Sequence, residues 1–312
     1  MKRSALYALL LGGGALAIAT PFYVSSNRKP GWDVSRRQYT LPNGWGISPV
    51  GRSVTLPGDM PGNILVIDGG RRALVNTCGF HDHSLSLVDL QDGHVVASVP
   101  FQKSWIGLAR LGDDVLLSAG QGGGMHRFSV DELKPREQVV VPGPTGNDRF
   151  VSSIVVGAEG TYALNIQTDE VFLLDGSDVK AKAKVSYRPY GAVLSPDGTT
   201  LAVSEWGNRS VVLLDAKSLD VQSRVTVGSH PTAVAYAADG RLFVSNAGST
   251  SVSVIKGGKV VETIEVGVDA ARRIGPTPVA LALDAGGKRL FVANAGENCV
   301  ALVDVSKPGR AR

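Results

Sequence analysis

Cysteine, aromatic side chains and an excess of one charge are all scarce in this sequence. Only two cysteines, Cys78 and Cys299, occur in 312 residues, which excludes a disulfide framework by number. One bridge between them and two separate buried thiols are both open. Lysine and arginine together number 32 against 28 acidic residues, and no basic run occurs. The electrostatic footprint of nucleic-acid binding is therefore missing, and we expect no nucleic-acid partner.

Common catalytic motifs are missing as well. There is no Gly-x-Ser-x-Gly elbow, no His-Glu-x-x-His pair and no cysteine pair for c-type haem attachment. The glycine-rich stretch 120–124 is followed by neither Gly-Lys-Ser/Thr nor a helical pattern, so a phosphate-binding loop is excluded there. No cofactor is evident from these patterns.

The N-terminus has the pattern of a targeting segment. Lys2 and Arg3 precede an apolar stretch, 5–19, that ends in Ala-Ile-Ala. This predicts a cleaved signal peptide over 1–24 or, because apolar character continues to Val24, an uncleaved membrane anchor. Residues 25–50 are polar and read as a linker. We expect an exported protein, in a bacterial periplasm or tethered on the extracytoplasmic side of a membrane.

A unit of about forty residues repeats six times. Its clearest copies are Leu201–Asp215, Leu242–Lys256 and Leu290–Asp304; each has an apolar strand, a small loop with glycine and a second alternating strand. The six repeat ends lie 40 to 48 residues apart. Strand-rich repeats of this period are typical of β-propeller blades. We predict an all-β protein, with a propeller of four-stranded antiparallel blades over 51–312. It would have six blades, or seven if the parent protein is longer.

The first strand of the repeat region resembles the last strand of a blade, and this suggests how the ring closes. Arg52–Leu56 resembles the fourth strand of a later blade. We expect it to pair with the strand that ends at Asp304 and so complete the last blade. Asp-Gly pairs at 197–198 and 239–240 supply the positive φ of tight hairpins between first and second strands. Binding residues are then expected at the opposite end of the blades.

The repeat resembles a known family. Asn246-Ala247-Gly248 and Asn294-Ala295-Gly296, each after a Leu-Phe-Val strand, are similar to the YVTN-type β-propeller repeat. The segments 41–45, 105–109 and 188–191 resemble the N-terminal propeller of bacterial proteins that fuse such a propeller to an alkaline-phosphatase-like phosphoesterase. The resemblance implies that any phosphoesterase activity belongs to a C-terminal domain outside this chain.

The densest group of metal-competent side chains lies in the loop 78–83. His81, Asp82 and His83 are candidate ligands for a divalent transition metal, together with the thiol of Cys78. The alternative is a solvated polar loop.

A second candidate site is a funnel over the central channel. Aromatic, arginine and polar residues of the blade-to-blade and second-to-third loops would line it and bind an envelope protein, a glycan or a small anionic ligand. The candidate residues are Trp105, Arg149, Tyr190, Glu205, Trp206, His230, Asn246, Arg272, Arg273 and Asn294. The alternative is that the aromatics pack between blades and the arginines are solvated.

Three functions follow from these patterns. The first is an exported, non-catalytic binding or scaffold module. The second is a lactonase-like or metal-assisted hydrolase that works in the funnel, for which Asp59, Asp148 and Glu205 are the plausible acidic residues. The third is a periplasmic redox accessory protein. Propellers serve many chemistries, and the sequence favours the binding module because the acidic residues are so few.

Overall fold

The computed structural model describes residues 31–34, 38–41, 46–48, 51–143, 149–267 and 275–311. The chain divides into two compact units, Met1–Ser53 and Val54–Arg312. In the first unit, β1 (Gly31–Asp33), β2 (Gln38–Thr40) and β3 (Gly46–Ile47) form a small antiparallel sheet within the stretch that the sequence suggested is a linker. No helix in the described residues is long and apolar enough to cross a membrane.

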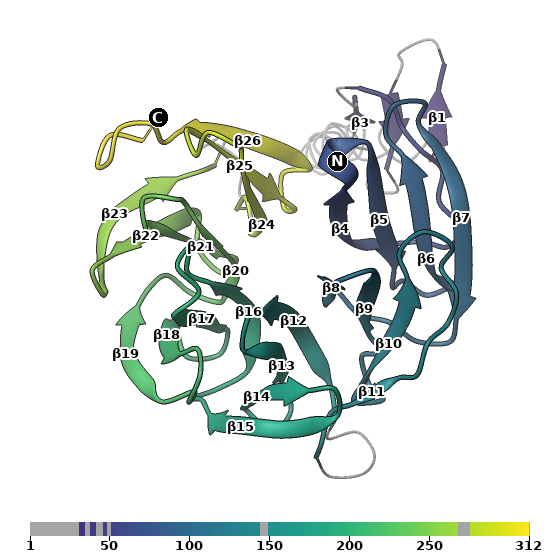
Figure 1. The fold of residues 1–312 in the computed structure, drawn as a ribbon. Helices are drawn as coiled ribbons and strands as arrows, with labels where there is room; N and C mark the ends of the chain where they lie inside the picture. The colour runs from purple at the N-terminus through teal and green to yellow at the C-terminus, as the bar shows by residue number, and fades with distance from the viewer. Residues whose placement is uncertain are drawn as a thin grey trace, which may run out of the picture. The chain divides into compact units, whose positions relative to one another are not determined.

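The second unit is a series of antiparallel sheets arranged around a common centre (Figure 1), which confirms the predicted propeller fold. We number these sheets as blades 1 to 6. Blade 1 has β4 (Pro61–Ile67), β5 (Arg72–Thr77), β6 (His83–Asp89) and β7 (His94–Phe101), with a single 3₁₀ turn (Asp68–Gly70) after β4. Blade 2 has β8 (Leu108–Leu111), β9 (Asp114–Ser118), β10 (Gly124–Ser129) and β11 (Val139–Val140). Blade 3 has β12 (Val151–Gly157), β13 (Gly160–Asn165), β14 (Glu170–Asp175) and β15 (Asp178–Lys184).

The remaining blades follow the same order. Blade 4 has β16 (Pro189–Leu194), β17 (Thr200–Glu205), β18 (Ser210–Asp215) and β19 (Val221–Thr226). Blade 5 has β20 (Pro231–Tyr236), β21 (Leu242–Asn246), β22 (Ser251–Lys256) and β23 (Lys259–Glu265). Blade 6 has three strands, β24 (Pro278–Leu283), β25 (Arg289–Asn294) and β26 (Cys299–Asp304).

Each sheet has two apolar faces because its strands carry hydrophobic residues on both sides. We call the side toward the next blade in the chain the forward face and the other the backward face. Five hydrophobic clusters join successive blades, each built from one forward and one backward face. In the cluster between blades 3 and 4, for example, Tyr162 and Leu164 pack against Leu201 and Val203. Burial of this kind stabilises by about 25 cal/mol per Å² of apolar surface.

A series of hydrogen bonds also links neighbouring blades near the centre. Each runs from a side chain of one blade to a backbone carbonyl at, or shortly before, the start of the next blade's inner strand. Four of them are Asn76 Nδ2 to Trp105 O (2.9 Å), Ser118 Oγ to Val151 O (2.6 Å), Ser152 Oγ to Pro189 O (2.8 Å) and Ser204 Oγ to Thr232 O (2.7 Å). These bonds satisfy carbonyl groups that burial would otherwise leave unpaired.

A left-handed residue precedes the inner strand in four blades. Met60, Arg188, His230 and Thr277 have φ between 48° and 53°, and a proline follows each of them. In each case the carbonyl accepts the N–H of the residue just after the second strand, as in Trp206 N to Arg188 O (2.9 Å). Because the conformation recurs, it belongs to the architecture of the repeat, and it presents one side chain per blade at the same end of the sheets.

The predicted closure of the ring is wrong. Arg52–Leu56 forms no strand and does not pair with β26, which is the edge of a three-stranded sheet. Val54 and Leu56 instead pack on Ala73, Val75 and Val88, on the backward face of blade 1. The alternating pattern indicated correctly that the segment has an apolar side, but it could not tell which blade that side would cover.

Removing one blade-to-blade hydroxyl tests these bonds. Ser204 is fully buried, and its hydroxyl also accepts the N–H of Gly191 at 2.9 Å. Ser204→Ala should lower the free energy of unfolding by about 1–3 kcal/mol because it leaves the buried carbonyl of Thr232 and the partly buried N–H of Gly191 without this partner. Chemical denaturation measures this change. Ser223→Ala, on the outer strand of the same blade, is the matched control; equal stability of the two variants would contradict the prediction.

Candidate active site

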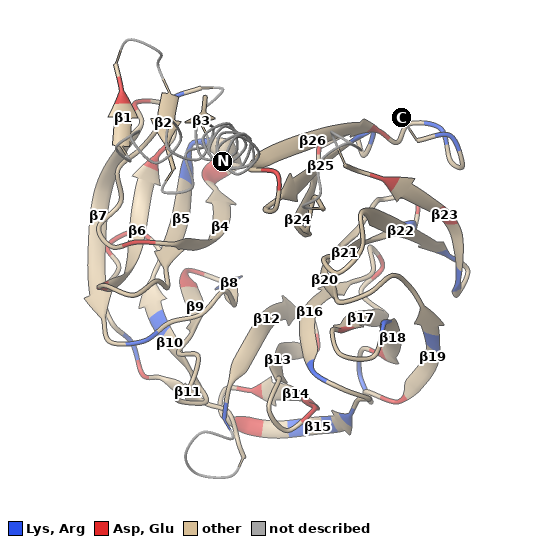
Figure 2. Ribbon diagram, turned by 180° about the vertical axis from the view of Figure 1, so that it is seen from behind, with Lys and Arg blue, Asp and Glu red and all other residues tan. Residues whose placement is uncertain are grey.

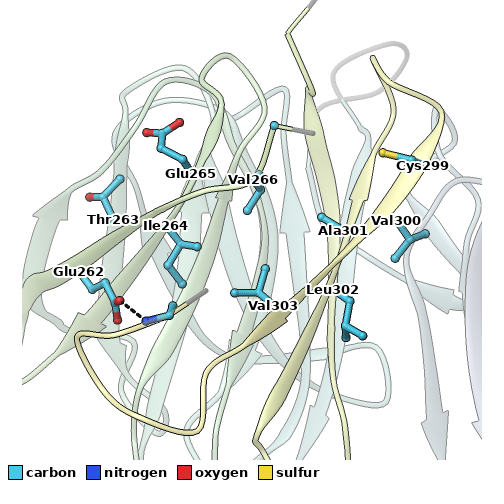
Figure 3. Close-up of a pocket in the computed structure, with 12 residues that line it drawn as sticks. Glu262, Thr263, Ile264, Glu265, Val266, Cys299, Val300, Ala301, Leu302 and Val303 are labelled. Carbon is cyan, nitrogen blue, oxygen red and sulfur yellow. Dashed lines mark hydrogen bonds between the residues drawn. The ribbon is translucent and has the colours of Figure 1, made fainter. Parts of the chain in front are cut away.

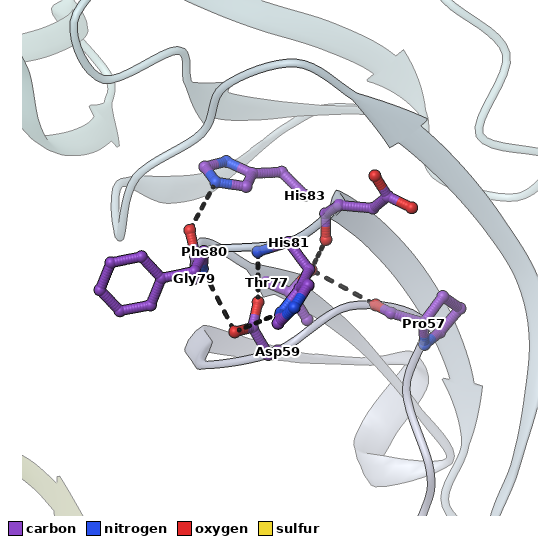
Figure 4. A network of polar contacts seen from close by, with 8 residues as sticks. Pro57, Asp59, Thr77, Gly79, Phe80, His81 and His83 are labelled. Carbon is purple, nitrogen blue, oxygen red and sulfur yellow. Dashed lines mark hydrogen bonds and ion pairs between the residues drawn. The ribbon is translucent and has the colours of Figure 1, made fainter.

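A histidine–aspartate pair lies at the end of blade 1 where the second-to-third loops and the blade-to-blade loops gather, which we call the loop face. Nδ1 of His81 is 3.1 Å from Oδ2 of Asp59 (Figure 4). The same carboxylate accepts the backbone N–H of Phe80 at 3.2 Å and of His81 at 3.1 Å. These bonds, the His81 N–H foremost, hold the pKa of Asp59 below its ordinary value. Asp59 is therefore ionised at neutral pH.

The pair is fixed by its loop and open to solvent. A Cβ on Gly79 would lie 2.2 Å from Oδ1 of Asp59, so only glycine leaves room for the carboxylate. The His81 side chain is 82% exposed. Because a carboxylate only accepts hydrogen bonds, Nδ1 of His81 donates to it, and Nε2 is left as the basic nitrogen. Phe80, whose side chain is 99% exposed, adds an apolar surface beside the pair.

His83, two residues on, has a structural part. Its Nδ1 accepts the backbone N–H of Ser104 at 2.7 Å, so Nε2 carries the proton and donates to the carbonyl of Gly79 at 3.1 Å. The Ser104 hydroxyl lies 3.2 Å from Nδ1 and donates to Thr77 O at 2.8 Å. His83 thus connects the 78–83 loop of blade 1 to the segment that leads into blade 2.

The structure does not bring His81, Asp82 and His83 together as a metal site. Within the described ranges, no three His, Cys, Asp or Glu side chains are grouped as metal ligands. Both nitrogens of His83 are used in hydrogen bonds. Cys78 is a buried thiol whose pKa is raised by burial and by the charge of Asp59, and no disulfide joins it to Cys299.

An aromatic pair lies on the loop face between blades 4 and 5. The rings of Trp206 and His230 are 4.5 Å apart, and Nδ1 of His230 is 3.0 Å from the Ser229 hydroxyl. The guanidinium of Arg188 lies 5.4 Å from the Tyr187 ring, within cation–π range. Trp206 and His230, which were both predicted for the funnel, are thus in contact in the structure.

Other predicted funnel residues are packed into the scaffold. Trp105 meets Phe150 edge-on at 5.2 Å, and Arg149 donates two hydrogen bonds to Gly143 O, at 2.9 and 2.6 Å. Asn246 and Asn294 are buried at the ends of their second strands. Arg272, Arg273 and Asp148 lie outside the described residues.

Tyr190 lies on the inner strand β16 of blade 4. Burial raises the pKa of its phenol, and Cys78 of blade 1 makes a smaller contribution in the same direction. A phenol with a raised pKa stays protonated at neutral pH and is available as a hydrogen-bond donor.

Glu205 is buried in an ion pair and is not available to a ligand. Its carboxylate receives Nε and Nη2 of Arg224 at 2.8 and 3.1 Å, the Ser186 N–H at 2.7 Å, and the Ser210 hydroxyl. Burial raises the pKa of Glu205, but these hydrogen bonds outweigh it, so its pKa lies below the ordinary value. Sequence reasoning missed the pair because Arg224 lies two strands away.

Neither the family models nor the curated proteins contain a match to this chain. Solved β-propellers do resemble it. A candidate 6-phosphogluconolactonase from Bacteroides uniformis has a TM-score of 0.65 and 15% identity, covering 80% of this chain and 82% of that one. Another from Bacteroides fragilis has a TM-score of 0.67 and 16% identity, covering 81% and 82%. A catalytically inactive H270A virginiamycin B lyase from Staphylococcus aureus, with quinupristin, has a TM-score of 0.65 and 16% identity, covering 81% and 83%.

These neighbours correct the functional expectation. The sequence led us to expect a non-catalytic binding module and no enzymatic activity of this chain. Two of the similar propellers are lactonase candidates and one is a lyase, so the comparisons contradict that expectation. At these identities the likeness itself shows the β-propeller fold.

The Glu205 pair generates a pH-dependent prediction. A carboxyl whose pKa is lowered on folding adds stability above its unfolded pKa and loses it as pH falls through the folded value. Glu205→Gln should therefore lower the free energy of unfolding by about 1–3 kcal/mol at pH 7, and the difference from wild type should shrink below about pH 4. Urea denaturation from pH 3 to 7 measures this; a difference that does not change with pH would contradict it.

Proposed function

We propose that this chain is a propeller enzyme that opens cyclic esters by hydrolysis, with His81 as general base. The observation that carries the proposal is the exposed His81 imidazole hydrogen-bonded to the ionised Asp59 carboxylate on the loop face. A carboxylate that accepts the Nδ1 proton of a histidine selects the tautomer with a basic Nε2 and stabilises the imidazolium that forms. The two lactonase candidates of similar fold support a cyclic ester as the class of substrate.

In the proposed reaction, His81 first accepts one proton and later returns it. Nε2 of His81 takes a proton from water as the water oxygen bonds to the ester carbonyl carbon. The ring C–O bond then breaks, and the imidazolium returns its proton to the departing alkoxide oxygen. The product is a hydroxycarboxylic acid, and Asp59 stays ionised throughout. The exposed Phe80 ring offers an apolar contact for the carbon skeleton.

Other expectations from the sequence form part of this proposal. The small anionic ligand expected at the funnel suits Arg188, Trp206 and His230, which lie on the same face. The asparagine-glycine loops at 246–248 and 294–296 support a repeat of the YVTN type, like that in the propeller–phosphoesterase fusions. The basic and apolar N-terminal segment supports export. Nothing in this mechanism uses the metal-assisted or redox alternatives.

The test measures the rate at which the full chain hydrolyses δ-valerolactone, by titrating the acid as it is released. We expect His81→Gln to lower kcat/KM by about 100-fold or more, the usual contribution of a general base. Asp59→Asn should lower it by at least about tenfold, because an amide can hold the wrong tautomer. His94→Gln, at the first residue of β7 near the opposite end of blade 1, is the matched control and should keep the wild-type rate.

Three outcomes would overturn the proposal. The first is wild-type activity in the folded His81→Gln variant. The second is the lack of any acceleration by the wild type over the buffer. The third is an unsaturated product that contains no ¹⁸O when the reaction is run in H₂¹⁸O, since that product comes from elimination rather than hydrolysis.

A further inference from the structure

The forward face of blade 6 is built like a blade-to-blade contact but is exposed. Strand register places Phe291, Val300 and Leu302 where Phe243, Val252 and Val254 lie in blade 5. The blade 5 residues are fully buried against blade 6. Their counterparts in blade 6 are 36%, 63% and 57% exposed. An exposed group of large apolar side chains is expected to be covered by another protein segment.

The backward face of blade 1 is also exposed, but only on its inner strand β4. On β4, Ile64 and Val66 are 57% and 54% exposed. The register of β4 with β5 aligns them with Ala192 and Leu194 of blade 4, which pack in the cluster between blades 3 and 4. Blades 6 and 1 share no hydrophobic cluster among the described residues, unlike every successive pair from 1 to 6.

Residues 54–56 hold the position of an outer strand on this open face. They lie against β5 and β6 of blade 1. Between blades 4 and 5, Val225 of the outer strand β19 and Val227 just beyond it lie against the corresponding strands β21 and β22. Val54 and Leu56 therefore pack on blade 1 as the outer strand of a preceding blade would, although the other strands of that blade are not among the described residues.

Blade 6 in turn has no outer strand in the described part of the chain. Beside its edge strand β26 lies a groove of about 530 Å³, bounded by β23 of blade 5 and lined by Ile264, Val266, Leu302 and Val303 (Figure 3). In the preceding pair of blades, β19 contacts β23 at the corresponding place. The backbone N–H groups of Gly309 and Ala311 reach Glu262 on β23 at 3.0 and 2.9 Å, beside this groove.

We propose that the two open faces and the groove together form a docking site for one further repeat of the same kind, about forty residues in four strands. Its first strand would pair with β26 in the groove. Its other three strands would form a sheet between blade 6 and residues 54–56. The strands of this repeat would follow one another in the order outer, inner, second and third. Residues 221–256 contain their strands in the same order, from the outer strand β19 of blade 4 to the third strand β22 of blade 5. The occupant must carry apolar residues on both faces, as those residues do.

The test adds such a unit to the full chain. A variant with a copy of residues 221–256 after Arg312 should unfold at a Tm higher by about 5 °C or more. The amide protons of β26 should exchange at least about tenfold more slowly than in the unmodified chain. A matched control carries the same copy with the counterparts of Leu242, Val244 and Ile255 changed to serine, and it should give neither effect.

A point variant keeps the test decisive if the added copy folds poorly. Leu302→Ser should leave the Tm of the unmodified chain nearly unchanged and lower the Tm of the extended chain, whereas Val254→Ser should lower both. An unchanged Tm together with unprotected β26 amides in the extended chain would overturn the proposal. Sedimentation of the unmodified chain as a dimer with protected β26 amides would also overturn it, because the occupant would then be a second copy.

Discussion

The structure depends on the fact that no blade can bury both of its faces alone. Each sheet carries valine, leucine or phenylalanine on both sides, so it buries both faces only when it lies between two neighbours. The same contacts fix the angle between blades and bring one end of every sheet to the loop face. The aligned carbonyls at the starts of inner strands, held by Ser118, Ser152 and Ser204, add a polar connection to this apolar one. This packing therefore sets where the described loops at the ends of the sheets lie.

The loop face shows how the scaffold separates structural from chemical roles. Glu205 and His83 are ionisable, yet their hydrogen bonds are fully committed to holding strands and loops together. His81 is bound only through one nitrogen, to a carboxylate that is itself fixed by two backbone N–H groups. A site needs this combination of a fixed orientation and an accessible reactive atom. Burial alone would have pointed to the wrong residues.

Repetition made the fold predictable from sequence, whereas the site depended on contacts between distant residues. The forty-residue period and the Asp-Gly turns indicate blades because they reflect local backbone preferences. The pairing of Asp59 with His81 joins segments 22 residues apart, and the burial of Glu205 depends on Arg224 across the blade. Neither is visible in a pattern of residue types. The destination of Arg52–Leu56 was likewise undetermined, since an alternating strand can cover any backward face.

The left-handed residue before each inner-strand proline has a consequence for how such a scaffold can diversify. Positive φ is costly for a side chain larger than glycine, yet methionine, arginine, histidine and threonine occupy the four positions, Met60, Arg188, His230 and Thr277. Their backbones are held in place by the same carbonyl hydrogen bond, so the identity of the side chain is free to vary. The turn therefore acts as a set of interchangeable display positions, through which a propeller can acquire a new ligand preference without repacking any blade.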